Sequence, residues 1–358
     1  MSAYKDEKTE TWYAYFRYTD WTGERKQKMK RGFPTRREAL EWERSFLQQS
    51  AADLSMPFED FVVIYSNDIK NRIRENTWMT KENIIRTKLL PFFGKKKMNE
   101  IHTKDVIAWQ NEMLTSGGGY GKGYSPTYLK TLHNQLSAIL NHAVRHYELK
   151  NNVAAKAGPI GKKDATEMLF WTKDEYLKFA DAMMDKPISY YAFEVLYWCG
   201  LRLGEMLALT PADFDFSKET VSVTKSYQRL KGEDVITAPK TAKSVRVINM
   251  PEFLCDEIKE YLNMIYGVQP TDRIFTISKA YMHHEMDRGS KVAGVKRIRI
   301  HDLRHSHVSL LIELGFSALA IADRVGHESI DITYRYAHLF PSKQSEMAAR
   351  LNIEKGIF

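Results

Sequence analysis

The C-terminal half of the chain carries a scattered set of cationic side chains, imidazoles and a tyrosine whose chemistries complement one another. A guanidinium grips two phosphate oxygens at once, an ammonium or imidazole moves a proton, and a phenol can act as a nucleophile. Together these groups are suited to breaking a phosphodiester bond. The set consists of Arg202, Lys240, His301, Arg304, His327 and Tyr336.

Arg202, the first of these residues, lies in the sequence GLRLGE and has apolar neighbours on both sides. A cation in such surroundings is expected to be partly buried and therefore needs an anion. Glu205 follows three residues later, within reach on a helix. Taken alone, a structural Arg–Glu pair and a functional arginine explain this cluster equally well.

Lys240 and the histidines are weak signals when each is viewed alone. A lysine on a turn, as Lys240 is in APKTAKSVRVI, is usually only solvated. His301 and Arg304 stand three residues apart in HDLRHSH and are expected to share a helix face. His301 and His305 have the spacing of a metal-binding pair, but no Glu lies between them. Because no cysteine pair or carboxylate run completes a ligand set, the sequence disfavours a metal site.

The tyrosine has a rival. Tyr336 follows His327 by nine residues in VGHESIDITYRYAH, and Tyr334 stands two positions earlier. On a helix these two side chains would point about 200° apart, so only one could face a phosphate. No cluster of carboxylates suited to magnesium is evident, and guanidinium groups would therefore have to neutralise the charge that develops at phosphorus.

Charge is distributed unevenly along the chain, which has 358 residues and a net charge of +8. Residues 1–50 contain 11 Lys and Arg against 8 Asp and Glu, residues 51–160 contain 15 against 10, and the remainder contains 27 of each. The whole surplus therefore lies in the first 160 residues. This pattern favours a polyanionic partner held by the N-terminal part, with a merely solubilising surface as the alternative.

Several protein classes are disfavoured by composition. Two cysteines do not make a disulfide scaffold or a four-cysteine zinc site. The longest apolar run is broken by Glu194, so no membrane span is predicted, and the N-terminus lacks the apolar core of a secretory signal. We therefore expect a soluble intracellular protein.

The first 50 residues predict a small module of strands and a helix. Residues 12–18 alternate bulky aromatic and smaller residues, residues 25–33 form a strongly basic strand, and a helix begins after Thr35 as N-cap. A basic sheet of this size can lie in a DNA groove. The side chains expected to contact DNA are Arg25, Lys26, Lys28, Lys30 and Arg31.

The rest of the chain predicts a mainly helical protein with small sheets. Residues 51–160 carry four apolar stripes at helical spacing, the longest at 129–144. The glycine-rich segment 116–123 lacks the ending of a phosphate-binding loop and is predicted to be a flexible loop. Residues 151–165 are predicted to be a linker, after which helices surround strands at 220–224 and 244–250.

Four segments together resemble the signature of the tyrosine recombinase family, also called the phage integrase family. They are GLRLGE, PKTAKSVRVI, HDLRHSH and VGHESIDITYRYAH. The resemblance is specific as a set of four, extends over nearly the whole chain, and is closest in kind to integrases of temperate phages and integrative conjugative elements. His327 occupies a position where some members carry Trp.

This resemblance implies a multidomain, mainly α fold with small β-sheets (α+β). Residues 1–50 would form an arm-type DNA-binding module with a three-stranded sheet. Residues 56–155 would form a helical core-binding domain, and residues 165–358 the catalytic domain with a C-terminal tail. The tail is expected to contain a short amphipathic helix that packs either on its own domain or on a neighbouring protomer.

The resemblance also implies roles for the site residues. Tyr336 would attack the scissile phosphate, leaving a 3′-phosphotyrosyl link and a free 5′-hydroxyl. Arg202 and Arg304 would clamp the non-bridging oxygens, and Lys240 would protonate the leaving 5′-oxygen.

The remaining roles fall to the imidazoles and one carboxylate. His301 would accept the tyrosine proton or bind the phosphate, His327 would hydrogen-bond the phosphate, and Glu205 would support Arg202. The bond energy would be kept in the phosphotyrosine, so the implied enzyme needs no metal, ATP or other cofactor.

The implied activity is site-specific recombination that integrates and excises a mobile element or prophage, in the cytoplasm of a bacterial host in association with the nucleoid. Expected partners are double-stranded DNA with core and arm sites, further copies forming a homotetramer on DNA, a host bending factor and an excisionase. A type IB topoisomerase would share the chemistry, and a non-catalytic DNA-binding protein would share the fold. Both remain alternatives at this point.

Overall fold

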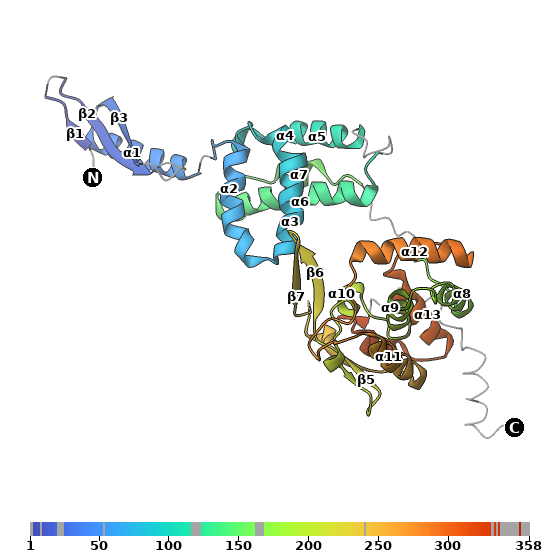
Figure 1. Cartoon of the computed structure of the whole chain (residues 1–358). Coiled ribbons are helices and arrows are strands. Elements are labelled where there is room, and N and C mark those ends of the chain that lie inside the picture. The colour runs from blue at the N-terminus through green and yellow to red at the C-terminus, as the bar shows by residue number, and fades with distance from the viewer. Residues whose placement is uncertain are drawn as a thin grey trace. The chain divides into compact units, whose positions relative to one another are not determined.

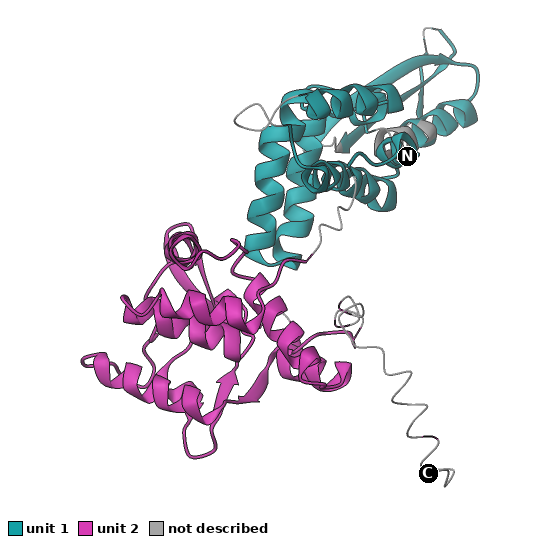
Figure 2. Ribbon diagram, turned by 90° about the vertical axis from the view of Figure 1, so that its right-hand side faces the viewer, with its two compact units in different colours: residues 1–165 teal, residues 166–358 magenta. Residues whose placement is uncertain are grey.

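The computed structural model divides the chain into two units, Met1–Ala165 and Thr166–Phe358 (Figures 1 and 2). Each unit is described by itself below. The structure describes residues 3–7, 9–19, 25–52, 54–115, 123–161, 168–239, 241–330, 333, 336 and 351.

Unit 1 begins with an antiparallel three-stranded sheet covered on one side by a helix. Ala14 and Phe16 point from the middle strand toward this helix, where they pack with Trp42 and Phe46. The three-stranded sheet that the family resemblance implied is confirmed, as are the two strands and the helix predicted from residue pattern. In chain order the elements are β1 (Ala3–Lys5), β2 (Trp12–Thr19), β3 (Arg25–Phe33) and α1 (Arg36–Ala52).

The remainder of unit 1 is helical, as predicted up to residue 150, but residues 153–157 of the predicted linker form a short helix because Asn152 caps it and Ala154 is buried in the core. Its longest helix, α6, begins where the Ser125 hydroxyl accepts the Tyr128 N–H and Pro126 fixes the first turn. The apolar stripe from Leu129 to Ala143 lies buried along one face of α6. The helices are α2 (Phe58–Ile69), η1 (Lys70–Arg72), α3 (Glu75–Ile84), the π-helical η2 (Ile85–Leu89), α4 (Leu90–Phe93), η3 (Met98–Glu100), α5 (Thr103–Thr115), α6 (Pro126–His146) and α7 (Val153–Ala157).

Unit 2 wraps helices around a central apolar helix, α9, whose side chains are buried on nearly every side. The predicted N-cap Thr172 forms a capping box with Glu175 at the start of α8. The helices are α8 (Lys173–Asp181), α9 (Pro187–Trp198), α10 (Leu203–Met206), η5 (Pro211–Asp213), η6 (Ala242–Ser244), α11 (Glu252–Met264), α12 (Lys279–Ala293), α13 (Asp302–Glu313) and α14 (Ala318–Val325) (Figure 1).

Two small antiparallel sheets complete unit 2. The predicted strands at 220–224 and 244–250 correspond to β5 and β8, which pair with Val221 opposite Ile248. A hairpin turns at Lys231 and Gly232, both with positive φ, and was not predicted. The strands are β4 (Phe214–Asp215), β5 (Thr220–Val223), β6 (Ser226–Leu230), β7 (Glu233–Thr237) and β8 (Arg246–Asn249), in the orders β4-β5-β8 and β6-β7.

The observed architecture confirms the predicted fold class, mainly helical with small antiparallel sheets. Within the part of the chain that the structure describes, every helix is too short or too polar to span a membrane.

Candidate active site

Arg202 stands at the start of α10, directly after the turn that ends α9. Gly200 makes this turn with φ +63°, and a Cβ there would lie 2.5 Å from the His307 ring. The main-chain nitrogen of Arg202 donates to Glu205 Oε2 at 3.0 Å, and its Nη1 donates to Oε1 at 2.7 Å. The Arg–Glu pair that the sequence predicted is therefore formed, and it also closes the first turn of α10.

Glu205 holds a second guanidinium, which belongs to Arg246 at the start of β8. Arg246 Nη2 donates to Glu205 Oε2 at 3.0 Å, and its Nε donates to the carbonyl of Arg324 at 3.1 Å. Burial by itself would raise the pKa of Glu205, but Arg246 and Arg202 outweigh it and hold that pKa below its usual value. One ionised carboxylate thus faces two cations, which leaves this corner of the unit positively charged.

Arg304 is the most deeply buried cation of the predicted set, with 2% of its surface exposed. Its Nη1 donates to the carbonyl of Gly200 at 2.8 Å, and its Nη2 donates to the carbonyl of Val325. Burial lowers the pKa of Arg304 to about 9, and the charges of Arg202 and Arg246 add to this effect. A cation held by neutral carbonyls keeps its charge available for an anion from outside the protein.

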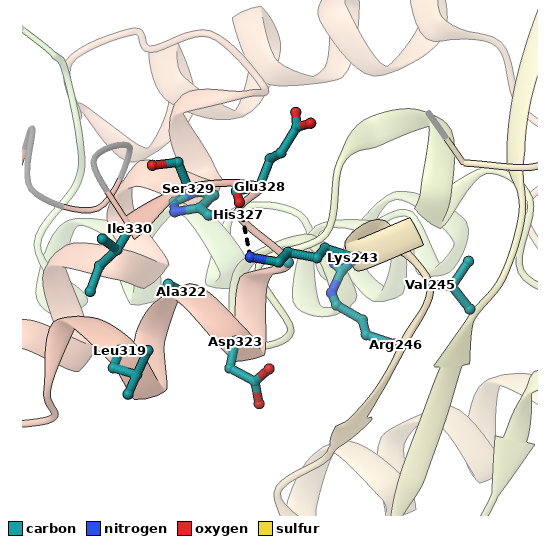
Figure 3. A pocket seen from close by; sticks show the side chains of 11 residues that line it. Lys243, Val245, Arg246, Leu319, Ala322, Asp323, His327, Glu328, Ser329 and Ile330 are labelled. Carbon is teal, nitrogen blue, oxygen red and sulfur yellow. Dashed lines mark hydrogen bonds between the residues drawn. The ribbon is translucent and has the colours of Figure 1, made fainter. Parts of the chain in front are cut away.

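A cavity of about 590 Å³ opens beside Arg246 at the end of α14 (Figure 3). Gly326, with φ +66°, ends α14, and His327 follows it with Nδ1 2.8 Å from the hydroxyl of Thr333. Lys243 Nζ reaches over the cavity to the carbonyl of Glu328 at 3.0 Å (Figure 3). The lining residues are Lys243, Val245, Arg246, Leu319, Ala322, Asp323, Gly326, His327, Glu328, Ser329 and Ile330.

Tyr336 is buried against α13 and α14. It belongs to one buried apolar cluster with Val308, Ile321 and Val325, and its hydroxyl is in hydrogen-bonding contact with Nδ1 of His305. The predicted acceptor, His301, lies one turn earlier, with its ring centroid 5.1 Å from that of His305.

The imidazoles at the site are held neutral. Burial is the largest cause in each case, followed by neighbouring positive groups, and it lowers the pKa of His301, that of His305 to about 4 and that of His327 to about 3. A neutral imidazole has one ring nitrogen free to accept a proton or hydrogen bond. Among the residues with described positions, no three His, Cys, Asp or Glu side chains are grouped as metal ligands.

Four described members of the predicted set, Arg202, Arg304, His327 and Tyr336, meet at the C-terminal end of α14, whereas His301 is placed beside the His305 ring. Arg202 Nη2 donates to the Gly326 carbonyl at 3.3 Å, Arg304 donates to the adjoining Val325 carbonyl, and His327 follows directly. Tyr336 belongs to the same apolar cluster as Val325, and its phenol interacts electrostatically with Arg304. Lys240 and the rival Tyr334 lie outside the described residues, as does most of the predicted C-terminal tail.

Sequence reasoning missed Arg246 and His305. The alternation of β8 contained a signal for Arg246, because it shares the inward face with Ile248 while Val247 is exposed. A buried arginine needs an anion, and the ionised Glu205 is 41 residues away in sequence. His305 was considered only as a metal ligand, and its contact with Tyr336 spans 31 residues.

The basic residues predicted to contact DNA all lie on the exposed strand β3, but on two faces. Lys28 pairs with Phe16 and so lies on the α1 side, with Nζ 5.5 Å from the Phe46 ring centre. Alternate residues of a strand point to the same side, so Lys26 and Lys30 also lie on the α1 side. Arg25 and Arg31 lie on the face that points away from α1.

Comparison with known protein families matches most of the chain. Residues 170–343 match the phage integrase family, residues 57–114 match the N-terminal SAM-like domain of phage integrases, and residues 2–50 match the arm DNA-binding domain.

Individual proteins agree with these matches. The ICEBs1 integrase of Bacillus subtilis strain 168 is 29% identical over 340 residues, covering 89% of this chain and 90% of that one. The structure of the Tn1549 transposon integrase with a circular intermediate DNA has a TM-score of 0.66 at 20% identity, covering 82% of this chain and 98% of that chain. A lambda integrase tetramer bound to a Holliday junction gives a TM-score of 0.59 at 18% identity, covering 92% and 96%. The two structures share their fold with this chain.

Proposed function

The chain belongs to the phage integrase family, and on this premise we propose that Tyr336 is the nucleophile with which it cleaves and rejoins DNA. The enzyme is a site-specific tyrosine recombinase, which integrates and excises a mobile element or prophage. The observation that carries the residue assignment is the convergence of Arg202, Arg304, His327 and Tyr336 on the end of α14.

In this reaction Tyr336 Oη attacks the scissile phosphorus, forming a 3′-phosphotyrosine and releasing a 5′-hydroxyl. Arg202 and Arg304 bind the non-bridging oxygens and neutralise the charge that develops in the transition state. The intact positive charge of Arg304, which is held by carbonyls, supports this role. Because the phosphotyrosine keeps the bond energy, another 5′-hydroxyl reverses the step without ATP or a metal ion.

The other predicted residues assist at the same phosphate. Lys240 protonates the leaving 5′-oxygen, His327 hydrogen-bonds the phosphate, and His301 accepts the tyrosine proton or binds the phosphate. Glu205 supports Arg202, a role favoured by their paired hydrogen bonds at 2.7 and 3.0 Å.

The substrate is double-stranded DNA with core and arm sites, and the working assembly is a homotetramer. Solved relatives are held on DNA, one of them as a tetramer on a Holliday junction, which supports this assignment. Residues 1–50 bind arm sites, residues 56–155 bind the core site, and residues 165–358 carry the chemistry. A host bending factor and an excisionase set direction, and the enzyme works on the nucleoid in the bacterial cytoplasm.

The test is a suicide substrate, a core-site duplex nicked so that the released 5′-hydroxyl strand diffuses away. Wild type should accumulate a covalent protein–DNA adduct, and Tyr336→Phe should form none. Tyr334→Phe is the matched control, because it removes the same hydroxyl two residues away and should retain the adduct. An adduct with Tyr336→Phe would refute the nucleophile assignment. Sequence-specific binding without cleavage would favour a non-catalytic DNA-binding protein, and site-independent supercoil relaxation by a monomer would favour a topoisomerase.

A further inference from the structure

Tyr336 and His305 make a contact that the roles given above leave unused. Tyr336 is 3% exposed, and its hydroxyl is in hydrogen-bonding contact with His305 Nδ1. The two ring centroids are 5.5 Å apart with the planes tilted by 53°. The proposed nucleophilic oxygen is therefore held by an imidazole nitrogen rather than by a solvated surface group.

We propose that His305 accepts the phenol proton of Tyr336 as the tyrosine attacks the phosphate, and that His301 serves the phosphate instead. This inference rests on the proposed function, in which Tyr336 is the nucleophile. It adds a catalytic residue, because His305 touches the reacting oxygen.

The surroundings of His305 keep its imidazole neutral. On its own helix it faces His301, Asp302 and Arg304; Arg299 approaches from the preceding loop and His327 from the end of α14. Burial, and then the positive neighbours, lower the pKa of His305 to about 4, against the opposing effect of Asp302. The ring is therefore neutral near pH 7 and has a lone pair to offer.

Asp302 fixes which nitrogen carries that lone pair. It is fully buried, with Oδ1 3.8 Å from His305 Nε2, a charge interaction rather than a hydrogen bond. Arg299 holds this carboxylate through its main-chain nitrogen at 2.8 Å and its Nη2 at 2.8 Å. A fixed negative charge beside Nε2 favours the tautomer with hydrogen on Nε2 and the lone pair on Nδ1, toward Tyr336. The same charge stabilises the imidazolium that forms during attack.

The step balances without any further reagent. The Oη–P bond forms as the P–O5′ bond breaks, the phenol proton moves to His305 Nδ1, and the leaving 5′-oxygen takes a proton from Lys240. In the rejoining step a 5′-hydroxyl attacks the phosphorus and gives its proton to the Lys240 amine, while the P–Oη bond breaks and the imidazolium returns its proton to Tyr336 Oη. The His301 ring, at the start of α13, meets the His305 ring edge-on with the two centroids 5.1 Å apart, and we assign His301 to the phosphate.

The experiment measures single-turnover cleavage of the suicide substrate by His305→Ala in the full-length protein. Loss of a general base should slow adduct formation by about 10²- to 10⁴-fold. Added imidazole should restore part of the rate, and ring-substituted imidazoles should restore more as their basicity rises. His284→Ala, an exposed histidine on α12, is the matched control and should cleave like wild type, with no response to imidazole.

A second variant separates proton transfer from positioning. His305→Asn places an amide near the position of Nδ1, so it keeps a hydrogen-bonding partner for Tyr336 without a base, and it should remain slow. Thermal unfolding and DNA binding of both variants should stay near wild type, which ties the loss to the chemical step. Near-wild-type cleavage by His305→Asn, or a loss that no imidazole restores, would overturn the inference. If Tyr336→Phe abolishes the adduct while the His305 variants cleave normally, this inference fails and the proposed function stands.

Discussion

The chain holds the cations that we propose to contact DNA in two different ways, on β3 in unit 1 and around α14 in unit 2. On β3 every residue from Arg25 to Gly32 is exposed, and lysines such as Lys28 rest over aromatic rings. Around α14, Arg304 and Arg246 are buried and bound to fixed oxygens. Exposed cations bind a polyanion through counterion release and tolerate shifts in position, whereas buried cations are positioned in advance for one charge distribution. This difference matches the proposed roles, in which the exposed cations of β3 hold DNA and the buried cations around α14 act on the reacting phosphate.

Substitution of Arg304 should have the largest effect on cleavage. Arg304→Lys keeps a cation but cannot bind two carbonyls and a phosphate oxygen with one planar group. We expect single-turnover cleavage of the suicide substrate to fall by about 10²-fold or more, the loss typical of one oxyanion donor. Arg297→Lys, on an exposed arginine that pairs with Asp287, is the matched control and should cleave normally. Equal rates for the two variants would mean that Arg304 does not act on the phosphate.

Glu205 should affect both stability and cleavage, because its carboxylate binds two cations, Arg202 and Arg246. Glu205→Gln should lower the free energy of unfolding by about 3 kcal/mol, since it leaves the buried Arg246 without its carboxylate. Cleavage should slow by roughly tenfold to a hundredfold as Arg202 loses its orientation. Glu285→Gln removes another buried carboxylate with two cationic partners, and should cost stability without slowing the bound complex. If both variants cleave at the same rate, Glu205 acts on the fold alone.

The pH dependence of stability should differ between Glu205 and a second buried carboxyl, Glu194. The pKa of Glu205 lies below its ordinary 4.5, so its stabilising contribution is complete above pH 4.5 and is lost as the pH falls below that value. Burial raises the pKa of Glu194 to about 7, so the stability linked to that group is complete below pH 4.5 and is lost as the pH rises toward 7.

Melting temperatures measured from pH 3.5 to 8 check this difference. The difference in melting temperature between wild type and Glu205→Gln should become smaller only at the acid end. Glu194→Gln should gain stability relative to wild type between pH 4.5 and 7. Parallel curves for all three proteins would contradict these assignments.

The smallest effects should come from β3, where its two faces provide an internal control. Replacing both Arg25 and Arg31 by Ala should weaken arm-site binding and lower the slope of log K against log salt by roughly 0.9 per lost contact. Replacing Lys28 and Lys30 removes the same charge from the α1 side and should cost less. Neither pair should change cleavage at an isolated core site. A larger loss from the lysine pair would place the DNA on the α1 side of the sheet.

Local patterns in the sequence predicted the elements that depend on local physics. The stripe along α6 and the cap at Thr172 were both found, because helical periodicity and capping are written within a few residues. The β6–β7 hairpin was missed although Lys231 and Gly232 form a two-residue turn, since the flanking strands alternate weakly. Helix α12 was also missed, because Met282 and Met286 are buried but most of the residues around them in the sequence are polar, so no clear apolar stripe is visible.

The site was predicted as a list of residues rather than as a geometry. The family boxes named Arg202, Arg304 and Tyr336, and these three residues lie in one unit, near the end of α14. Contacts such as Arg246 with Glu205 and His305 with Tyr336 join segments 41 and 31 residues apart. Such contacts depend on how β8, α13 and α14 pack, and residue spacing alone does not encode that packing.

The carbonyl partners of Arg304 have a consequence for how this position can vary. Val325 is the last residue of α14, so its oxygen lies at a helix C-terminus, where the aligned peptide dipoles concentrate negative charge and carbonyls lack intrahelical partners, whereas Gly200 lies in the turn after α9. One side chain thus caps α14 and joins it to the turn after α9. Substitution of Arg304 should therefore weaken the packing of α13 against α14 and the turn after α9 even when no DNA is bound. The same residue would then contribute both to the stability of the fold and to the reaction.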